Sequence, residues 1–225
     1  MALRSARLPR ILSGFSGALA DIGQPVSASP WSRVLRMSVA VTDRRIERTR
    51  EALEGAFIRL MFEGRRYDRI TIADLIARAG VGRSTFYEHY RNKDELLAAT
   101  IRYPFAGVAA AVDANANVAS LRDALLHFEG NRVHARAVFT GAARRRIVRV
   151  LAAMIEERLR VRARESGVVP AATLGIVASA LAEGMLATIV AWLGGEVAGD
   201  AAKIAAALHA MAQAIATGLC MRPSA

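Results

Sequence analysis

The pattern of apolar and polar positions is helical along most of the chain. Between residues 43 and 63, apolar side chains recur every three or four residues, which predicts an amphipathic helix. Further stretches of this period follow, separated by glycine-containing or polar breaks, and the alternation typical of strands is nearly absent. We therefore expect an all-α fold. The expected helices cover residues 43–63, 72–79, 82–89, 94–114, 118–128, 132–140, 143–164, 170–193 and 200–219.

The stretch ITIADLIARAGVGRSTFYEHYRNKDELL, residues 70–97, has the pattern of a helix-turn-helix unit. Thr71 is placed to cap the first helix, and Asp74 stands at the position that completes a capping box. Gly80 follows the last apolar position of that helix, where it can supply the positive φ of a sharp turn. The sequence therefore predicts two short helices joined by a tight turn.

The second helix of this unit has two distinct faces. Phe86 and Tyr90 are one helical turn apart and are expected to point inward. The other side carries hydrogen-bond donors of modest length, which suit base edges and phosphates. These outward residues are Arg83, Ser84, Thr85, Tyr87 and His89. We expect this helix to read DNA.

Lys93 opens a third helix, directly after the predicted cap Asn92, with Glu95 at the capping-box position. A cation at a helix N-terminus opposes the helix dipole, so its placement there favours a shared role with the dipole on a phosphate. Pro104 lies in the middle of this helix, which we expect it to kink or break. The complete set of expected phosphate contacts is Arg44, Arg45, Thr71 and Lys93.

At these residues the chain resembles the tetracycline-repressor (TetR) family of bacterial transcription regulators. The resemblance is carried by Thr71, Ile72, Ala73, Ile76, Ala79-Gly80-Val81, Thr85-Phe86-Tyr87, His89-Tyr90, Lys93 and Glu95-Leu96. It implies an N-terminal three-helix DNA-binding domain followed by a helical domain that binds a small-molecule effector. It also implies a cytoplasmic homodimer, held by a four-helix bundle from residues 170–219 of both subunits, that binds a palindromic double-stranded operator. One departure is Gly82, where the family usually has serine or threonine.

Three segments are expected. Residues 1–42 lack a helical apolar period and carry scattered Gly, Ser and Pro, so we expect a disordered extension; the alternative is that translation starts at Met37. Residues 43–97 form the predicted helix-turn-helix DNA-binding domain. Residues 98–225 form the predicted effector-binding and dimerisation domain.

Charge adds little to this interpretation. The formal net charge is +11, which is compatible with a nucleic-acid partner. However, all but two of the 31 basic residues are arginine, and they are spread along the chain. The DNA-binding hypothesis therefore rests on the motif. A single cysteine, Cys220, excludes an intrachain disulfide, while a redox-sensing thiol and an inert one are both open.

Enzyme, metal and membrane interpretations find little support. There is no glycine-rich phosphate loop and no nucleophile elbow, so we expect no catalytic residue and no cofactor. His127 and His134 are seven residues apart, but a metal site needs further ligands at matching spacing, and we expect none. The apolar run 171–193 is long enough to span a membrane, but Glu183 lies near its centre. The run Arg144-Arg145-Arg146, with Arg149, predicts a solvated face or, alternatively, a site for an anionic effector.

A candidate effector pocket can be drawn from apolar, aromatic and thioether side chains of the helical domain. Its expected lining is Phe105, Phe128, Phe139, Met154, Glu183, Met185 and Trp192. Glu183 is the polar residue expected to face inward and orient the ligand. The alternative is that these side chains only pack the core or the dimer seam.

Two functions remain open. The first is a ligand-responsive dimeric regulator, acting as a repressor on a palindromic operator. The second is a helical ligand-binding or interaction protein without DNA activity. The second predicts a damaged recognition helix, and the donors between residues 83 and 89 are retained. The sequence therefore favours the regulator.

Overall fold

The computed structural model describes residues 30–167 and 174–220, and all the regular structure in these ranges is helical. This confirms the predicted all-α class. The chain separates into two compact units, residues 1–44 and 45–225. The helices are α1 (Pro30–Phe62), η1 (Tyr67–Arg69), α2 (Ile72–Ala79), α3 (Arg83–His89), α4 (Lys93–Ala109), η2 (Ala110–Val112), α5 (Val118–Gly130), α6 (Arg132–Thr140), α7 (Arg144–Glu165), α8 (Leu174–Gly194) and α9 (Ala201–Cys220).

Helix α1 begins at Pro30, upstream of the predicted start at residue 43. Proline suits the first turn of a helix, because its missing N–H would have no partner there. Residues 31–42 contain neither glycine nor a second proline, so nothing in them interrupts the helix. The missing apolar period argues against a buried face, but it does not argue against helical backbone. The expectation for residues 1–29 lies outside the described residues.

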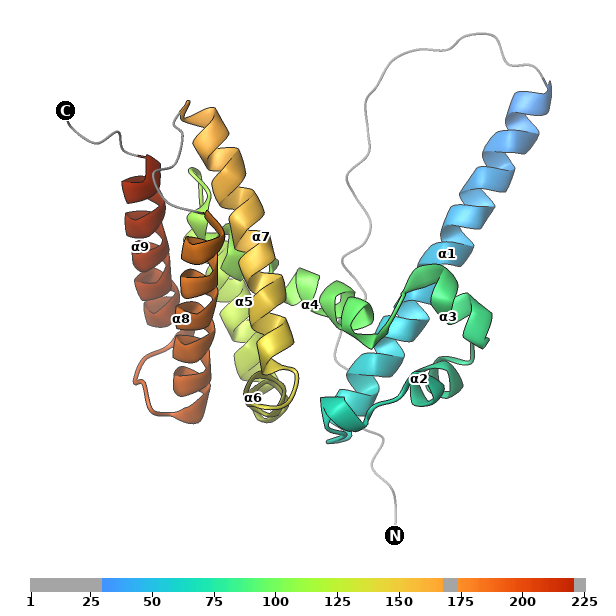
Figure 1. Cartoon of the computed structure of the whole chain (residues 1–225), viewed down its shortest axis with the longest axis horizontal. Coiled ribbons are helices and arrows are strands. Elements are labelled where there is room, and N and C mark those ends of the chain that lie inside the picture. The colour runs from blue at the N-terminus through green and yellow to red at the C-terminus, as the bar shows by residue number, and fades with distance from the viewer. Residues whose placement is uncertain (1–29, 168–173, 221–225) are drawn as a thin grey trace. The chain divides into compact units, whose positions relative to one another are not determined.

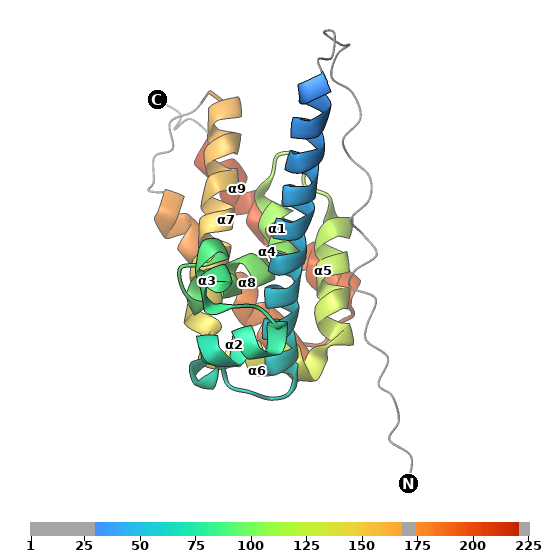
Figure 2. The ribbon, with the colours of Figure 1, turned by 90° about the vertical axis from the view of Figure 1, so that its right-hand side faces the viewer.

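The helices after the helix-turn-helix unit pack around α4 and α7 (Figures 1 and 2). Helix α4 packs on both α5 and α7, α8 packs on α7, and α9 packs on α5. One continuous cluster of buried apolar side chains reaches from Leu53 in α1 to Ala216 in α9. The helix-turn-helix unit and the helical body from α4 to α9 therefore share a core.

Two residues of α4, Pro104 and Gly107, bear on its continuity and on its packing against α5. Pro104 lies inside the helix, which runs without a break from Lys93 to Ala109, so the predicted break does not occur. Proline removes one backbone hydrogen bond, and burial of Ile101, Phe105 and Val108 on neighbouring turns holds the helix together. Two residues past Phe105, a Cβ built on Gly107 would lie 2.2 Å from the Ser120 carbonyl oxygen. The backbones of α4 and α5 therefore touch at this glycine.

Two segments, residues 93–112 and α8, are long and apolar enough to cross a membrane by length and composition. Both pack against other helices of the same chain, the first against α5 and α7 and the second against α7. Glu183, near the middle of α8, forms a two-armed ion pair with Arg144 of α7 at 2.6 and 3.1 Å. Packing within the fold thus accounts for part of their apolar character.

Candidate nucleic-acid interface

Helix α2 begins with the predicted capping box. The Thr71 side chain accepts a hydrogen bond from the Asp74 amide at 3.1 Å, and the Asp74 carboxylate accepts one from the Thr71 amide at 2.9 Å. These bonds occupy amides that the first helical turn leaves without partners. The bonds that the Thr71 amide and hydroxyl donate to the Asp74 carboxylate lower the pKa of that carboxyl, with a smaller contribution from Arg65. The start of α2 is therefore fixed by local sequence.

The turn after α2 is left-handed at Gly80, with φ 68° and ψ 33°. The amide of Val81 donates to the Ile76 carbonyl at 3.1 Å, which closes the end of the helix. A non-glycine residue in this region of φ and ψ is disfavoured. The predicted tight turn is confirmed, and it places α3 directly after α2.

The inner face of α3 is anchored to the core. Phe86 is fully buried, and Tyr90, which follows the helix, is almost so. The Tyr90 hydroxyl donates to the Glu54 carboxylate of α1 at 2.8 Å. Burial, and then this hydrogen bond, raise the pKa of the Tyr90 hydroxyl. Because the burial of Phe86 and Tyr90 and the hydrogen bond to Glu54 hold this face in place, the opposite face of α3 has a defined orientation.

The opposite face of α3 carries the predicted DNA-reading residues. Arg83, Ser84 and Tyr87 are exposed, whereas Thr85 and His89 are half-buried. The Arg83 guanidinium lies over the Tyr87 ring, 5.8 Å from its centroid, which is within the range of a cation–π contact. Gly82 occupies the cap position and provides no side-chain hydrogen bond to the helix.

The start of α4 differs in part from the prediction. Asn92 accepts a hydrogen bond from the Glu95 amide at 2.9 Å, as expected of a cap. The Glu95 carboxylate, however, accepts from the amide of Arg91 at 2.7 Å and not from that of Asn92. The cap is therefore present, and its reciprocal bond is shifted by one residue.

Lys93 is held within the protein, which differs from the phosphate contact expected of it. Its ammonium donates to the carbonyl oxygens of Tyr67 and Ile70, both at 2.7 Å, and lies over the Tyr67 ring at 4.4 Å. Burial lowers the pKa of Lys93. Two of its three donors are thus engaged, and the side chain fastens α4 to the segment before α2. The placement at a helix N-terminus is explained by these carbonyls.

The remaining expected phosphate contacts lie on the surface. Arg44 and Arg45 are exposed on α1, and Thr71 is exposed at the start of α2. The Thr71 hydroxyl also donates to the Asp74 carboxylate at 2.8 Å, so part of its hydrogen-bonding capacity serves the cap.

Sequence reasoning missed a cluster around Tyr67, which is buried in η1. Its hydroxyl donates to the Asp94 carboxylate, and Asp94 also pairs with the Arg146 guanidinium at 2.7 Å. Burial and the bond to Asp94 raise the pKa of the Tyr67 hydroxyl. Burial acts to raise the pKa of the Asp94 carboxyl, but hydrogen bonds from Arg146 and Tyr67 outweigh it, so the pKa is lowered. No local sequence pattern links residues so far apart.

The expected effector lining is mostly packed side chains. Phe105, Phe128 and Phe139 pack against one another in tilted and edge-to-face arrangements, with ring centroids 5.1 to 5.4 Å apart. Met185 and Trp192 are buried, and the Trp192 indole donates to the Gly199 carbonyl at 2.9 Å. Met154 is half-buried.

The prediction that Glu183 faces inward is wrong. Its side chain is about half exposed, and its carboxylate is bound by Arg144 from the neighbouring helix. An unpaired carboxylate in the apolar interior would be costly, and α7 supplies a cation at the surface. Arg144 and Arg146 of the predicted arginine run are therefore both occupied in ion pairs within the chain.

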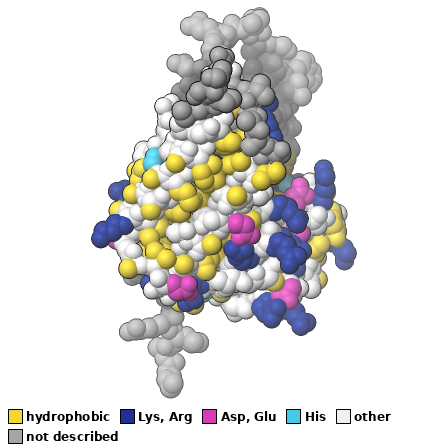
Figure 3. Space-filling model, turned by 60° about the vertical axis from the view of Figure 1, so that its left-hand side comes forward, with side chains coloured by type: hydrophobic (Ala, Val, Ile, Leu, Met, Phe, Trp, Pro, Cys, Tyr) yellow, Lys and Arg dark blue, Asp and Glu magenta, His cyan; other side chains and the backbone are white. Residues whose placement is uncertain are grey.

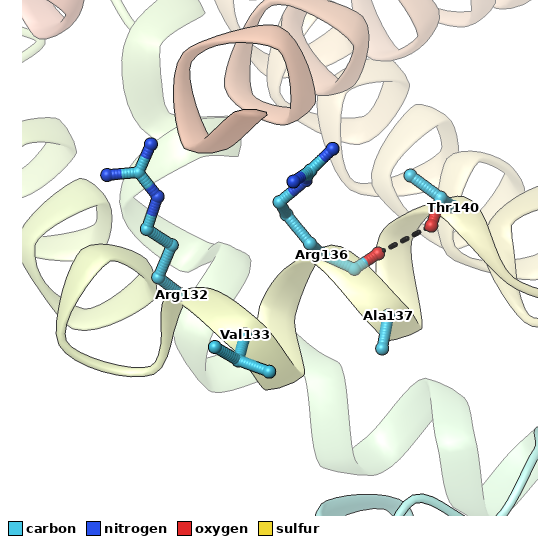
Figure 4. Close-up of a pocket in the computed structure, with 5 residues that line it drawn as sticks. All are labelled: Arg132, Val133, Arg136, Ala137 and Thr140. Atoms are coloured by element: carbon cyan, nitrogen blue, oxygen red, sulfur yellow. Dashed lines mark hydrogen bonds between the residues drawn. The ribbon is translucent and has the colours of Figure 1, made fainter. Parts of the chain in front are cut away.

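A pocket of about 350 Å³ lies along α6, outside the predicted lining (Figure 4). Arg132 and Arg136 project from one side of the helix, and the Arg132 guanidinium donates to the Leu193 carbonyl at 2.6 Å. Its lining residues are Arg132, Val133, Arg136, Ala137 and Thr140. In the part of the chain that the structure describes, no three His, Cys, Asp or Glu side chains are grouped as a metal site requires. The Cys220 side chain lies outside that part.

Comparison with known proteins agrees with this geometry. Residues 59–100 match the family model described as bacterial regulatory proteins of the tetR family. A 60-residue stretch is 48% identical to the uncharacterized HTH-type transcriptional regulator YxbF of Bacillus subtilis (strain 168), and the match spans 27% of this chain and 16% of that protein.

Two solved structures extend the comparison. The crystal structure of a TetR transcriptional regulator from Streptococcus agalactiae 2603V aligns with 78% of this chain and 99% of its own, at a TM-score of 0.51 and 26% identity. RolR in complex with the ligand resorcinol aligns with 81% of this chain and 98% of its own, at a TM-score of 0.40 and 23% identity. The second likeness is too low to support an inference about ligands.

The buried scaffold behind α3, its exposed donors and the family match over residues 59–100 define a helix-turn-helix unit of the kind found in bacterial transcriptional regulators. Residues 59–100 are similar to the DNA-binding unit of the TetR family of bacterial transcriptional regulators. Proteins of this family bind DNA operators and are not enzymes.

Proposed function

We propose that the protein is a dimeric, ligand-responsive repressor that reads a palindromic operator through α3. The observation that carries this proposal is the division of α3 into an anchored face, with Phe86 fully buried, and an exposed face with Arg83, Ser84 and Tyr87. Arginine, serine and tyrosine can donate to base edges and phosphates. Thr85 and His89 are the further candidates on this helix. Arg44, Arg45 and Thr71 remain the proposed phosphate contacts. Lys93 remains one through the single ammonium donor that its bonds to the Tyr67 and Ile70 carbonyls leave over.

Dimerisation is proposed through α8 and α9. Figure 3 shows hydrophobic side chains gathered on the side of the molecule that carries these helices. Ile176 is 70% exposed and Ile215 38% exposed, with exposed alanines such as Ala187 and Ala210 on the same two helices. An apolar surface of this kind on a regulator with one reading helix per chain favours a second copy as its partner. Two copies would place recognition helices about 34 Å apart, one turn of DNA.

The effector is proposed to enter the helical body beside the packed rings of Phe105, Phe128 and Phe139. These rings come from α4, α5 and α6, and Met185 lies buried in the adjoining α8. Met154 and Trp192 complete the proposed lining. Because the rings already touch, a ligand must separate them and so displace α4. Ligand and DNA would then each weaken binding of the other by the same factor. As a DNA-binding regulator, the protein would act in the cytoplasm.

The experiment is selection of bound duplexes from a random library by the full chain, followed by gel-shift titration. We expect an inverted repeat to be enriched. Arg83→Ala and Tyr87→Ala should weaken binding about fivefold or more, or change the preferred base, since a good base contact contributes about 1–3 kcal/mol. The matched control is Arg149→Ala, which removes an exposed arginine from α7 and should have little effect. The alternative, a helical ligand-binding or interaction protein without DNA activity, predicts no enriched sequence.

A further inference from the structure

Helix α4 is fastened at both ends, largely by arginines of α7. At the far end, Gln213 of α9 donates to the carbonyls of Ala111 and Asp113 at 2.7 and 2.8 Å. Arg162 of α7 donates to the Val112 carbonyl at 2.8 Å and to the Gln213 side chain at 2.9 Å. Arg158, also on α7, pairs with the Asp113 carboxylate. Several bonds from two helices therefore hold η2.

The near end of α4 has a different attachment. Arg146 is the α7 residue there, with its guanidinium nitrogen 2.7 Å from the Asp94 carboxylate and its charge 5.1 Å from the Tyr67 ring centroid. Asp94 lies in the first turn of α4 and accepts the Tyr67 hydroxyl. One arginine of the helical body thus contacts both the start of α4 and the segment before α2. We call Arg146, Asp94 and Tyr67 the latch.

The two attachments differ in strength. The Arg146 and Asp94 side chains are 41% and 47% exposed, and ion pairs with that exposure contribute little free energy. Three hydrogen bonds reach the backbone carbonyls of the far end, a fourth joins Arg162 to Gln213, and the Arg158–Asp113 pair adds to them. Since the far end is held more firmly, the orientation of the helix-turn-helix unit depends on the weaker near end. Tyr67 itself is 3% exposed, so the latch acts on a residue built into the core of that unit.

We propose that Arg146 is a positioning residue for operator binding: it orders the helix-turn-helix unit against α7 without touching DNA. The proposal rests on the proposed function as an operator-binding regulator. A unit held in its binding orientation loses less freedom when it docks. Removal of the latch should therefore lower operator affinity. For an exposed pair the loss is up to about fivefold per subunit, and up to about 25-fold for a dimer that docks two units.

The sign of the effect separates the latch from bulk electrostatics. Arg146→Met removes a positive charge, and Asp94→Asn removes a negative one. Long-range attraction to DNA predicts that the first change lowers affinity and the second raises it. The latch predicts that both lower it, and that the double variant is no weaker than the weaker single variant, because either change alone opens the same contact.

The test uses the full chain and the duplex that the unmodified protein selects from a random library, with fluorescence anisotropy at several salt concentrations. Arg149→Met, which removes a neighbouring exposed arginine from α7, is the control. We expect unchanged affinity for the control, lower affinity for Arg146→Met and Asp94→Asn, and an unchanged salt slope, since the latch makes no phosphate contact. A higher affinity for Asp94→Asn, additive losses, or a slope reduced by about one for Arg146→Met would overturn the proposal.

Hydrogen exchange of the free protein provides a readout that needs no DNA. Faster exchange at residues 67–70 and 94–98 is expected in both latch variants and not in Arg149→Met. Unchanged exchange would overturn the latch even if operator binding is intact. If no duplex is selected while exchange changes as expected, operator binding fails and with it the positioning role, whereas the contact itself stands.

Discussion

The Tyr90 hydroxyl lies 2.8 Å from the Glu54 carboxylate, which ties the residue after the recognition helix to α1. Tyr90→Phe should lower the free energy of unfolding by about 1–2 kcal/mol, because Glu54 loses a donor in a partly buried place. Tyr87→Phe is the matched control, since Tyr87 is 45% exposed, and it should change stability by less than about 0.5 kcal/mol. Urea denaturation measures both. Equal effects of the two substitutions would argue against the anchoring role of Tyr90.

Gly80→Ala tests the left-handed turn between α2 and α3. A Cβ at Gly80 would meet nothing within 4 Å, but φ is +68°, so the cost is conformational alone, about 1–2 kcal/mol. Gly80→Asn should cost less, because asparagine tolerates this conformation better. Thermal unfolding in a calorimeter would show the order. Equal melting temperatures for glycine and alanine would contradict the assigned turn.

Gly107→Ala should be among the most destabilising alanine substitutions in the chain. Its Cβ would lie 2.2 Å from the Ser120 carbonyl oxygen, and backbone must move to make room, at a cost of about 1–3 kcal/mol or more. Gly130→Ala provides the contrast, since a Cβ there meets nothing within 4 Å. That substitution should be neutral or slightly stabilising in denaturant titrations. A well-tolerated Gly107→Ala would mean that α4 and α5 are not in backbone contact.

Ala187→Arg tests the proposed dimer face. Ala187 is exposed within one chain, whereas Ala182 is fully buried, so a charge at Ala187 probes association without first disturbing the fold. A buried, unpaired charge costs several kcal/mol, so the variant should be monomeric by light scattering. Ala77→Arg, an exposed position on α2, should remain dimeric. A monomeric parent protein at micromolar concentration would refute the proposed interface.

The Asp94 carboxyl gives a pH dependence with a definite sign. Its pKa is lowered in the folded protein, so its contribution to stability is present above the ordinary value of about 3.9 and is lost as pH falls through the folded value. The parent should therefore exceed Asp94→Asn in unfolding free energy near neutral pH, and the difference should shrink as the pH falls below about 3.9. Urea titrations across this range measure the difference. A gap that widens on acidification would contradict the pairing with Arg146.

Local sequence predicted the reading unit well, because its determinants are close in sequence. The capping box at Thr71, the left-handed Gly80 and the buried Phe86 all depend on neighbours within a few residues. The hydrogen-bond and ion-pair partners of Lys93 and Glu183 could not be predicted from local sequence. Their partners, the Tyr67 and Ile70 carbonyls for Lys93 and the Arg144 guanidinium for Glu183, are 23 to 39 residues away.

The same reasoning explains the start of α1 and the body of the fold. An apolar period indicates which face of a helix is buried. It could therefore not predict helical turns that have no such period, such as the start of α1 at Pro30. The sequence groups the aromatic residues Phe105, Phe128 and Phe139 by type, but only the packed structure shows their rings touching. Composition indicates what can line a cavity. It does not indicate whether the space is open.

The contact between Gly107 and Ser120 has a consequence for how α4 can move relative to α5. Because the two backbones touch there without a side chain between them, this contact is the point about which α4 would tilt on α5. The arm from Gly107 to Lys93 is about 21 Å long at 1.5 Å per residue, so a tilt of about 5° would move its free end by about 2 Å. A small rearrangement among the aromatic rings would therefore produce a larger displacement at the recognition helix α3. In a dimer both subunits would move in this way, and the distance between the two α3 helices would change by both displacements.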